Sequence, residues 1–287
     1  MNAFFVYLDI LGFKNIVANN TEPQLTGIVE SFFDGFNKAI DNSRTIPFTN
    51  MTDKTEGEWK ISLKELNFRL LSDSILIWTS NEHFRTFRNL LEASSQLVAY
   101  GLQNGFPLRG AMTYGEIIVQ KQDDADSIFF TNESIYGKAL VEAYSNEEEM
   151  DWSGCIVTLS AWKRICKIWD STLTRDQDPN AYFTRYPYLV WYPIPFKKGP
   201  QAGIAINWNS GVVYDSAKKI DPSLVRNSFS AHGKGFQPDT KKIDETLKFL
   251  DYTNQLQAYC FVPSCTESQN RRKTIPIPCA DYTPTAR

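Results

Sequence analysis

Apolar and polar positions along the chain predict a mixture of short strands and amphipathic helices. Residues 3–9 (AFFVYLD) form an apolar, aromatic-rich run that predicts a buried strand. A helical pattern begins after Gly12 and recurs through residues 30–40, where apolar residues return at helical spacing. Residues 41–64 are polar and turn-rich, so we expect a loop that leads into a strand.

The middle of the chain predicts a hairpin, a helix and further strands. The runs NFRLL and ILIWT flank Ser72-Asp73-Ser74, which is typical of a β-hairpin. Residues 82–103 predict a helix and residues 107–120 a second pair of strands. A helix over IYGKALVEAYSNEEE and a strand over residues 154–160 follow. This β-α-β-β-α-β order is the ferredoxin-like pattern that underlies palm domains.

The last part of the chain predicts two strands and then helices. The strands lie within residues 184–208 and join at Lys197-Lys198-Gly199. We therefore expect an α+β fold, with a ferredoxin-like palm in a catalytic domain over residues 3–208 and a C-terminal α/β extension. Residues 209–287 are expected to form a helical extension and a flexible tail, because the final residues are rich in proline and polar side chains.

Composition narrows the possible classes of function. The 287 residues carry a net charge of -3, so bulk positive charge cannot hold nucleic acid. The five cysteines form no CxxC pair, which argues against a zinc site or a disulfide framework. The N-terminal apolar run stops at Asp9 without a basic segment before it, and no run approaches the roughly 20 residues that span a bilayer. We expect a cytoplasmic protein with neither nucleic acid nor membrane as its partner.

A carboxylate ends the first predicted strand, in the segment DILGF that starts at Asp9. A buried carboxylate is costly without a partner, so Asp9 needs a cation or hydrogen-bond donors. Gly12 lets the backbone approach a ligand closely, and the amides of the following helix suit a phosphate group. The alternative is that Asp9 only caps this helix.

A second carboxylate, Asp73, lies at the tip of the predicted hairpin, where an Asp is also common as a simple turn residue. In a β-α-β-β order the first strand and the hairpin are neighbours, so Asp9 and Asp73 can converge. Two carboxylates beside a phosphate-binding turn suit Mg²⁺ or Mn²⁺. Arg109, at the start of a later strand, could donate to a triphosphate or could simply lie on a surface edge.

The segments YLDILGFK, FRLLSDSILIW and LRGAMTYGEIIV resemble, in this order, the catalytic domain of the class III nucleotidyl cyclases. IYGKALVEAYS and SGCIVTLS resemble the helix and strand that follow, so the resemblance covers roughly residues 3–165. It implies that Asp9 and Asp73 are the catalytic carboxylates that bind the metal ions, and that the main-chain carbonyl of Ile10 is a further metal ligand. It further implies two Mn²⁺ or Mg²⁺ ions in each site.

The same resemblance implies how the phosphates bind. Main-chain N–H groups near Leu11, Gly12 and Phe13 would hold the β- and γ-phosphates, and Arg109 would contact the phosphates through its side chain. The nucleotide would lie between the two subunits of a homodimer.

The base pocket departs from the family pattern. Arg69 stands where the family has a purine-selecting Lys, and Lys138 stands where it has a base-reading Asp. The family's transition-state Asn and Arg fall on Val141 and Ser145. Arg69 and Lys138 are therefore candidates for base reading or transition-state stabilisation, together with Lys197-Lys198 from a partner subunit.

The short motifs and the altered pocket look like those of the bacterial Pycsar pyrimidine cyclases. This resemblance implies conversion of UTP to 3′,5′-cyclic UMP and pyrophosphate as an anti-phage signal, with an effector protein that senses the cyclic nucleotide. A donor such as Lys138 in place of an acceptor favours the O4 atom of uracil. The alternatives are a cyclase for CTP, a purine nucleotide cyclase that makes cyclic AMP or GMP, and a non-catalytic cyclase-like regulatory module. No GGDEF motif is present, which disfavours a diguanylate cyclase.

Overall fold

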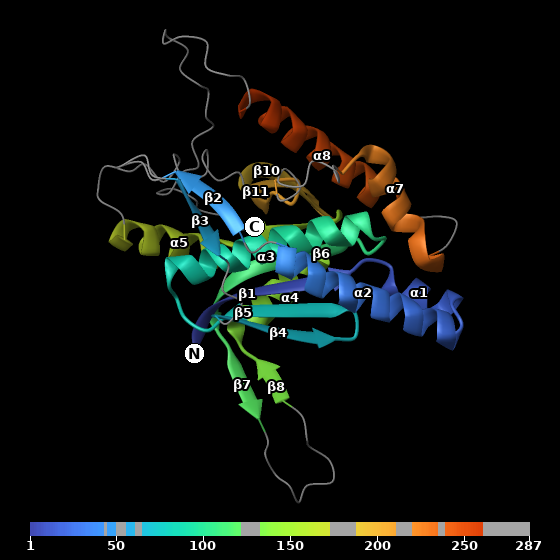
Figure 1. Ribbon diagram of the computed structural model, residues 1–287, viewed down its shortest axis with the longest axis horizontal. Coiled ribbons are helices and arrows are strands. Elements are labelled where there is room, and N and C mark those ends of the chain that lie inside the picture. Colours follow the sequence, from blue (N-terminus) through green and yellow to red (C-terminus); the bar gives the residue numbers. More distant parts are fainter. Residues whose placement is uncertain are drawn as a thin grey trace, which may run out of the picture.

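A seven-stranded sheet forms the centre of the protein (Figure 1). The computed structural model describes residues 1–42, 45–49, 56–60, 65–121, 133–172, 188–210, 220–234 and 239–260. In spatial order the strands are β10 (Leu189–Phe196), β11 (Gly199–Ile206), β9 (Gly154–Val157), β6 (Leu108–Glu116), β1 (Asn2–Ile10), β5 (Ser74–Thr79) and β4 (Leu66–Leu71). β1 is antiparallel to both of its neighbours, and β6 is parallel to β9. The expected α+β fold is confirmed.

Helices cover both faces of this sheet. The described ones are α1 (Phe13–Asn19), α2 (Glu22–Asn42), α3 (Phe84–Gln103), α4 (Lys138–Glu149), α5 (Leu159–Thr172), α7 (Pro222–Ser230) and α8 (Thr240–Cys260), with a 3₁₀ turn η4 (Ala231–Gly233). α3 contacts α2, α5 and α7 on one face, and α4 packs on β1 and β6 on the other. We refer to these as the α3 face and the α4 face.

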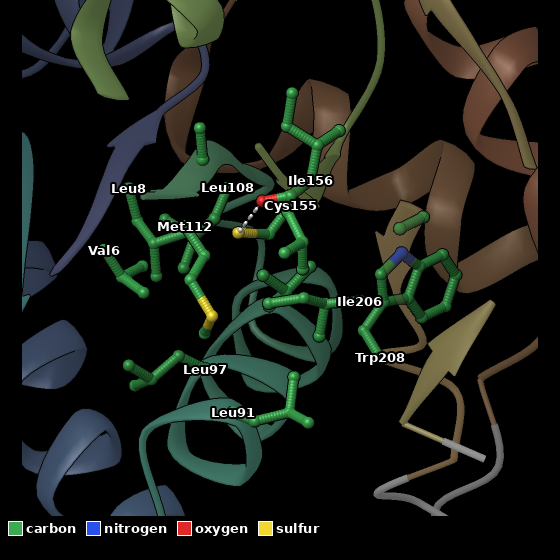
Figure 2. Packing of buried hydrophobic residues seen from close by; sticks show 14 of the residues in the cluster. Val6, Leu8, Leu91, Leu97, Leu108, Met112, Cys155, Ile156, Ile206 and Trp208 are labelled. Atoms are coloured by element: carbon green, nitrogen blue, oxygen red, sulfur yellow. Dashed lines mark hydrogen bonds between the residues drawn. The ribbon is translucent and has the colours of Figure 1, made fainter. Parts of the chain in front are cut away.

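The alternation of side chains along β1 assigns each residue to one face. Val6 and Leu8 belong to the main core with α3, where Figure 2 shows them beside Met112 and Leu97. Phe5 and Tyr7 belong to a smaller cluster with Ala139 and Ala143 of α4. Because successive side chains of a strand point to opposite faces, Asp9 continues the row on the α4 face.

The predicted C-terminal extension shares the core of the sheet. Phe249 of α8 lies 4.8 Å from Trp152 and 5.5 Å from Trp208, measured between ring centroids. Trp208 lies at one side of the core beside Ile206 (Figure 2). The described part of this segment contains α7, η4 and α8, and it is continuous with the core of residues 3–208. The predicted tail, from residue 261 onward, lies outside the described residues.

Two expected elements differ from the structure. The segment 41–64, expected to be mainly a loop, contains a hairpin of β2 (Thr45–Thr49) and β3 (Glu56–Lys60). Residues 107–120 do form two strands, but these do not pair with each other. β6 already has β1 and β9 as neighbours, so β7 (Ile118–Lys121) pairs instead with β8 (Glu133–Tyr136) in a separate hairpin that projects from the sheet (Figure 1).

Cys155 is a free thiol, and its complete burial raises its pKa well above the ordinary range. Within the part of the chain that the structure describes, no helix is both long and apolar enough to cross a bilayer.

Candidate active site

Asp9 and Asp73 lie side by side at one end of the sheet. The register of β1 with β5 places Asp9 opposite Ser74, and the Ile10 amide donates to the carbonyl oxygen of Asp73 at 3.1 Å. The Ser74 hydroxyl donates to Asp9 Oδ1 at 3.3 Å and lies 2.8 Å from the Tyr7 hydroxyl. The predicted convergence of the first strand and the hairpin tip is therefore present.

Asp9 lies in a setting that disfavours its negative charge. Burial, together with the nearby charges of Glu147 and Asp73, raises the pKa of Asp9 to about 7, against the opposing effects of Arg109 and the Ser74 hydrogen bond. Asp9 does not cap α1, because Gly12 occupies the N-cap position and no side chain caps the helix there. A divalent cation would relieve this excess of carboxylate charge, so the residues present fit Mg²⁺ or Mn²⁺.

The expected ligand set is small. Among the described residues, no group of three or more His, Cys, Asp or Glu side chains is arranged to hold a metal ion. The expected set has two carboxylates and the Ile10 carbonyl, and main-chain oxygens are ordinary ligands for these hard cations.

Arg109 lies next to Asp9 but is engaged by Glu147, a residue that the sequence did not single out. Arg109 is opposite Asp9 in the β1–β6 register. Its Nε donates to Glu147 Oε1 at 2.5 Å, and its Nη1 donates to the Met150 carbonyl at 2.7 Å. Their side chains are only 13% and 3% exposed, so this is a buried ion pair that joins β6 to the end of α4.

Burial also raises the pKa of Glu147, although Arg109 opposes that shift. A signal for Glu147 was present in the sequence. It follows Ala139 and Ala143 at intervals of four residues, and these three are the buried positions of α4. Four-residue spacing places them on the same side of a helix, facing the sheet.

The turn after β1 has the backbone conformation expected where a ligand comes close to the main chain. Gly12 has φ +81°, in the left-handed region, and its carbonyl accepts the amides of Asn15 and Ile16. The Leu11 amide, however, donates to the Pro107 carbonyl at 2.9 Å. The expectation that Leu11 offers its N–H to a phosphate is therefore wrong, because this turn crosses the loop before β6 and bonds to it. The Gly12 and Phe13 amides remain the predicted phosphate donors.

The candidate base-reading residues lie at the edge and on the surface of the α4 face. Arg69 is exposed on β4, opposite Leu76 in the β4–β5 register, and its Nη1 donates to the Phe68 carbonyl at 2.9 Å. Lys138 is exposed as the first residue of α4. Their surface position leaves both able to meet a ligand or a second subunit.

The Lys197-Lys198 pair lies in the turn between β10 and β11. This turn packs on the C-terminal end of α4, where the Lys197 amide donates to the Glu149 carbonyl at 2.7 Å. Lys198 Nζ lies 3.5 Å from the Glu149 carboxylate. The charge of Lys197 acts on Glu147 and opposes the rise in its pKa.

No family model and no curated protein sequence matches this chain. Solved structures of similar arrangement include a bacterial light-regulated adenylyl cyclase, with 10% identity over 79% of this chain and a TM-score of 0.44. A second is the guanylate cyclase domain of RhGC from Catenaria anguillulae in complex with GTP, with 10% identity over 71% of this chain and a TM-score of 0.41. A third is the adenylyl cyclase CyaB from P. aeruginosa, with 10% identity over 71% of this chain and a TM-score of 0.37.

This chain spans 56% of the length of the light-regulated cyclase, 95% of the Catenaria domain and 93% of CyaB. With identities near 10% and TM-scores below 0.5, these similarities assign neither a family nor an activity to the chain.

Proposed function

We propose that this protein is a nucleotide cyclase. It would convert a nucleoside triphosphate to a 3′,5′-cyclic nucleotide and pyrophosphate. A bond forms between the ribose O3′ and the α-phosphorus, and the bond from that phosphorus to the pyrophosphate oxygen breaks. The observation that carries the proposal is the convergence of Asp9 and Asp73 at the end of β1, directly before the Gly12 turn.

Asp9, Asp73 and the Ile10 carbonyl are the residues that would hold the metal ions. Two bound Mg²⁺ or Mn²⁺ ions would lower the pKa of the attacking hydroxyl and neutralise charge on the departing phosphates. The protein's own residues orient this centre: Ser74 and Tyr7 fix the Asp9 carboxylate by a chain of hydrogen bonds. Gly12 and Phe13 would offer their amides to the phosphates.

Arg109 can bind the phosphates of the substrate only if its present hydrogen bonds rearrange. As the structure stands, its guanidinium is held by Glu147 and Met150. Binding of a triphosphate beside Asp9 would compete with Glu147 for the same guanidinium, because phosphates accept bidentate bonds from Arg as carboxylates do. We therefore propose that Arg109 contacts the phosphates after exchanging partners.

We propose UTP as the substrate, with CTP as the alternative. Arg69 and Lys138 both carry donors, which suit the O4 and O2 atoms of uracil better than the amino group of adenine. The cyclic nucleotide would act as an anti-phage signal through an effector protein that binds it. A homodimer would bring Lys138, at the exposed start of α4, to the partner's site.

The deciding experiment incubates the purified chain with each of the four nucleoside triphosphates and Mn²⁺ and identifies the products by mass spectrometry. Cyclic UMP as the main product from the wild type, and no product from Asp9→Asn or Asp73→Asn, is the expected result. Cyclic AMP or GMP as the main product would overturn the pyrimidine assignment but would support the proposed cyclase activity.

A non-catalytic, cyclase-like regulatory module is the second candidate. The occupied Arg109 favours it, as do Val141 and Ser145 at the positions of the family's transition-state residues. This candidate predicts no product from any triphosphate while a labelled triphosphate still binds. Loss of that binding in Asp73→Asn would place the ligand at the same centre.

A further inference from the structure

A segment from late in the chain packs on the turn that follows β1. This segment, Ala231–Lys234, contains η4 and comes directly after α7. Three asparagine side chains of α1 and its C-terminal end hold it by donating to its carbonyl oxygens. The bonds run from Asn15 to Lys234 (3.1 Å), from Asn19 to Gly233 (2.7 Å) and from Asn20 to His232 (2.8 Å).

Two glycines make this close fit possible. A Cβ on Gly12 would lie 3.1 Å from Cδ of Lys234, and a Cβ on Gly105 would lie 2.5 Å from Cβ of Ala231. Both glycines also have φ in the left-handed region, at +81° and +82°. The Ala231–Lys234 segment is therefore fitted to the Gly12 turn and to the loop between α3 and β6 at the same time.

Lys234 is the residue that joins these parts. It is 8% exposed, and its ammonium donates to the carbonyl oxygens of Gly105 and of Ser228, the latter at 2.7 Å. In the part of the chain that the structure describes, no carboxylate forms an ion pair with it. Burial lowers the pKa of Lys234 to about 7.

Packing alone does not account for a charged residue at this position. A side chain of similar length without N–H donors would fill the same space, but it would leave the Gly105 and Ser228 carbonyls without the donor that joins them. The stem of Lys234 lies against the turn that is expected to meet the triphosphate, and its Nζ bonds to the loop before β6 and to the end of α7.

We propose that Lys234 is a positioning residue for nucleotide binding, which fixes the Gly12 turn by joining the Ala231–Lys234 segment to it and to the loop before β6. This inference rests on the proposed function, in which the Gly12 and Phe13 amides contact the phosphates. Because Lys234 acts through the turn, its loss should weaken substrate binding and leave the chemical step nearly unchanged.

The test compares Lys234→Met with the wild type, since methionine keeps the length of the stem and removes the charge and its donors. With Mn²⁺ and the preferred triphosphate, KM should rise about tenfold or more while kcat stays within about threefold. Hydrogen exchange of the Asn15 and Ile16 amides, which bond to the Gly12 carbonyl, should become about tenfold faster. Thermal unfolding checks that the variant is folded, and Lys234→Gln, which keeps an N–H donor group without the charge, replaces it if it is not.

Lys241→Met is the matched control. Lys241, on α8, is 59% exposed and pairs with Asp151, so KM and the exchange of both amides should stay at the wild-type values. A Lys234→Met protein with wild-type KM and wild-type exchange would overturn the inference. If the wild type makes no product from any triphosphate, the proposed function fails, and the exchange rates alone then decide whether Lys234 fixes the turn.

Discussion

At the scale of single residues, Asp9 shows how position alone changes a side chain's chemistry. It extends an apolar row on the α4 face, between Glu147 and Asp73, and its pKa rises to about 7. A carboxyl that holds its proton near neutral pH must lose that proton to bind a cation. Metal binding at this centre is therefore tied to pH.

We predict that Mn²⁺ raises the Tm of the wild type more at pH 8 than at pH 6. Below its pKa Asp9 keeps its proton, so the ion must displace it and binds more weakly. Asp9→Asn and Asp73→Asn should abolish this rise in Tm at both pH values, measured by thermal unfolding with and without Mn²⁺. Asp251→Asn, exposed on α8, serves as the control and should keep the shift. An unchanged shift in Asp9→Asn would exclude this carboxylate as a ligand.

A second buried carboxyl, Glu92 of α3, makes the stability of the protein depend on pH. Burial raises the pKa of Glu92 from 4.5 to about 8, with Arg88 opposing the shift. Between these values the folded chain binds a proton that the unfolded chain has lost. The stabilisation is therefore complete below about pH 4.5, falls as pH rises toward 8, and stays at its lower value above that.

We predict that Glu92→Gln removes this contribution. Its free energy of unfolding should exceed that of the wild type at pH 8 and approach it at pH 5, because a neutral amide replaces a carboxylate that is costly to bury. Urea denaturation at the two values measures the difference. A variant that is less stable than the wild type at pH 8 would contradict the prediction.

At the scale of elements, the Arg109–Glu147 pair fastens the end of α4 to β6. Both side chains are nearly buried, so removing one partner leaves an uncompensated charge. The sequence around Arg109 in β6 does not indicate that Glu147 is its partner, and the sequence around Glu147 in α4 does not indicate Arg109. Pairing across elements, rather than local sequence, defines this contact.

We predict that Arg109→Met destabilises the protein by about 3–5 kcal/mol at pH 8, as is typical when a buried ion pair loses one partner. The loss should be smaller at pH 5, where Glu147 can be protonated, because burial raises its pKa. Combining Arg109→Met with Glu147→Met should recover most of the stability in urea denaturation. Lys248→Met, at an exposed pair with Glu245, should have little effect, and a similar loss there would contradict the explanation.

At the scale of the whole molecule, the α4 face exposes several apolar side chains. Val141 and Tyr144 of α4 are 65% and 46% exposed, and Tyr136 of β8 is 45% exposed. Exposed apolar residues that gather on one face often mark a contact with another protein. This face also carries Asp9 and the candidate base-reading residues, which is the arrangement that a site shared between two copies needs.

We predict that Val141→Glu weakens self-association. A charge in the middle of an apolar contact is costly to desolvate, so we expect the variant to elute as a monomer and the wild type as a dimer. Light scattering after size exclusion measures the mass, and activity per chain should fall with it. Glu22→Lys, at the exposed start of α2, is the control and should leave the mass unchanged. A monomeric, fully active wild type would contradict the shared site.

Local pattern was enough to predict the central strands, including the strand end and the hairpin tip where Asp9 and Asp73 lie. The apolar run of β1, the ILIWT run of β5 and the small polar tip between β4 and β5 each have one plausible structure. It was not enough to predict the partner of β7. Because β6 is already paired with β1 and β9 on its two sides, β7 pairs with β8 instead. It also missed the β2–β3 hairpin, because polar residues and a central proline resemble a loop.

The sequence by itself determined the order of the central strands and helices and the positions of Asp9 and Asp73 at a strand end and a hairpin tip, since both follow from alternation and turn residues that act over a few positions. Only the tertiary structure decided which groups surround Asp9. Glu147 arrives from α4, Arg109 is engaged by it, the Leu11 amide is taken by Pro107, and Lys234 reaches the Gly12 turn from the far end of the chain. These contacts join segments that are distant in sequence, and distant segments meet only when the whole core packs.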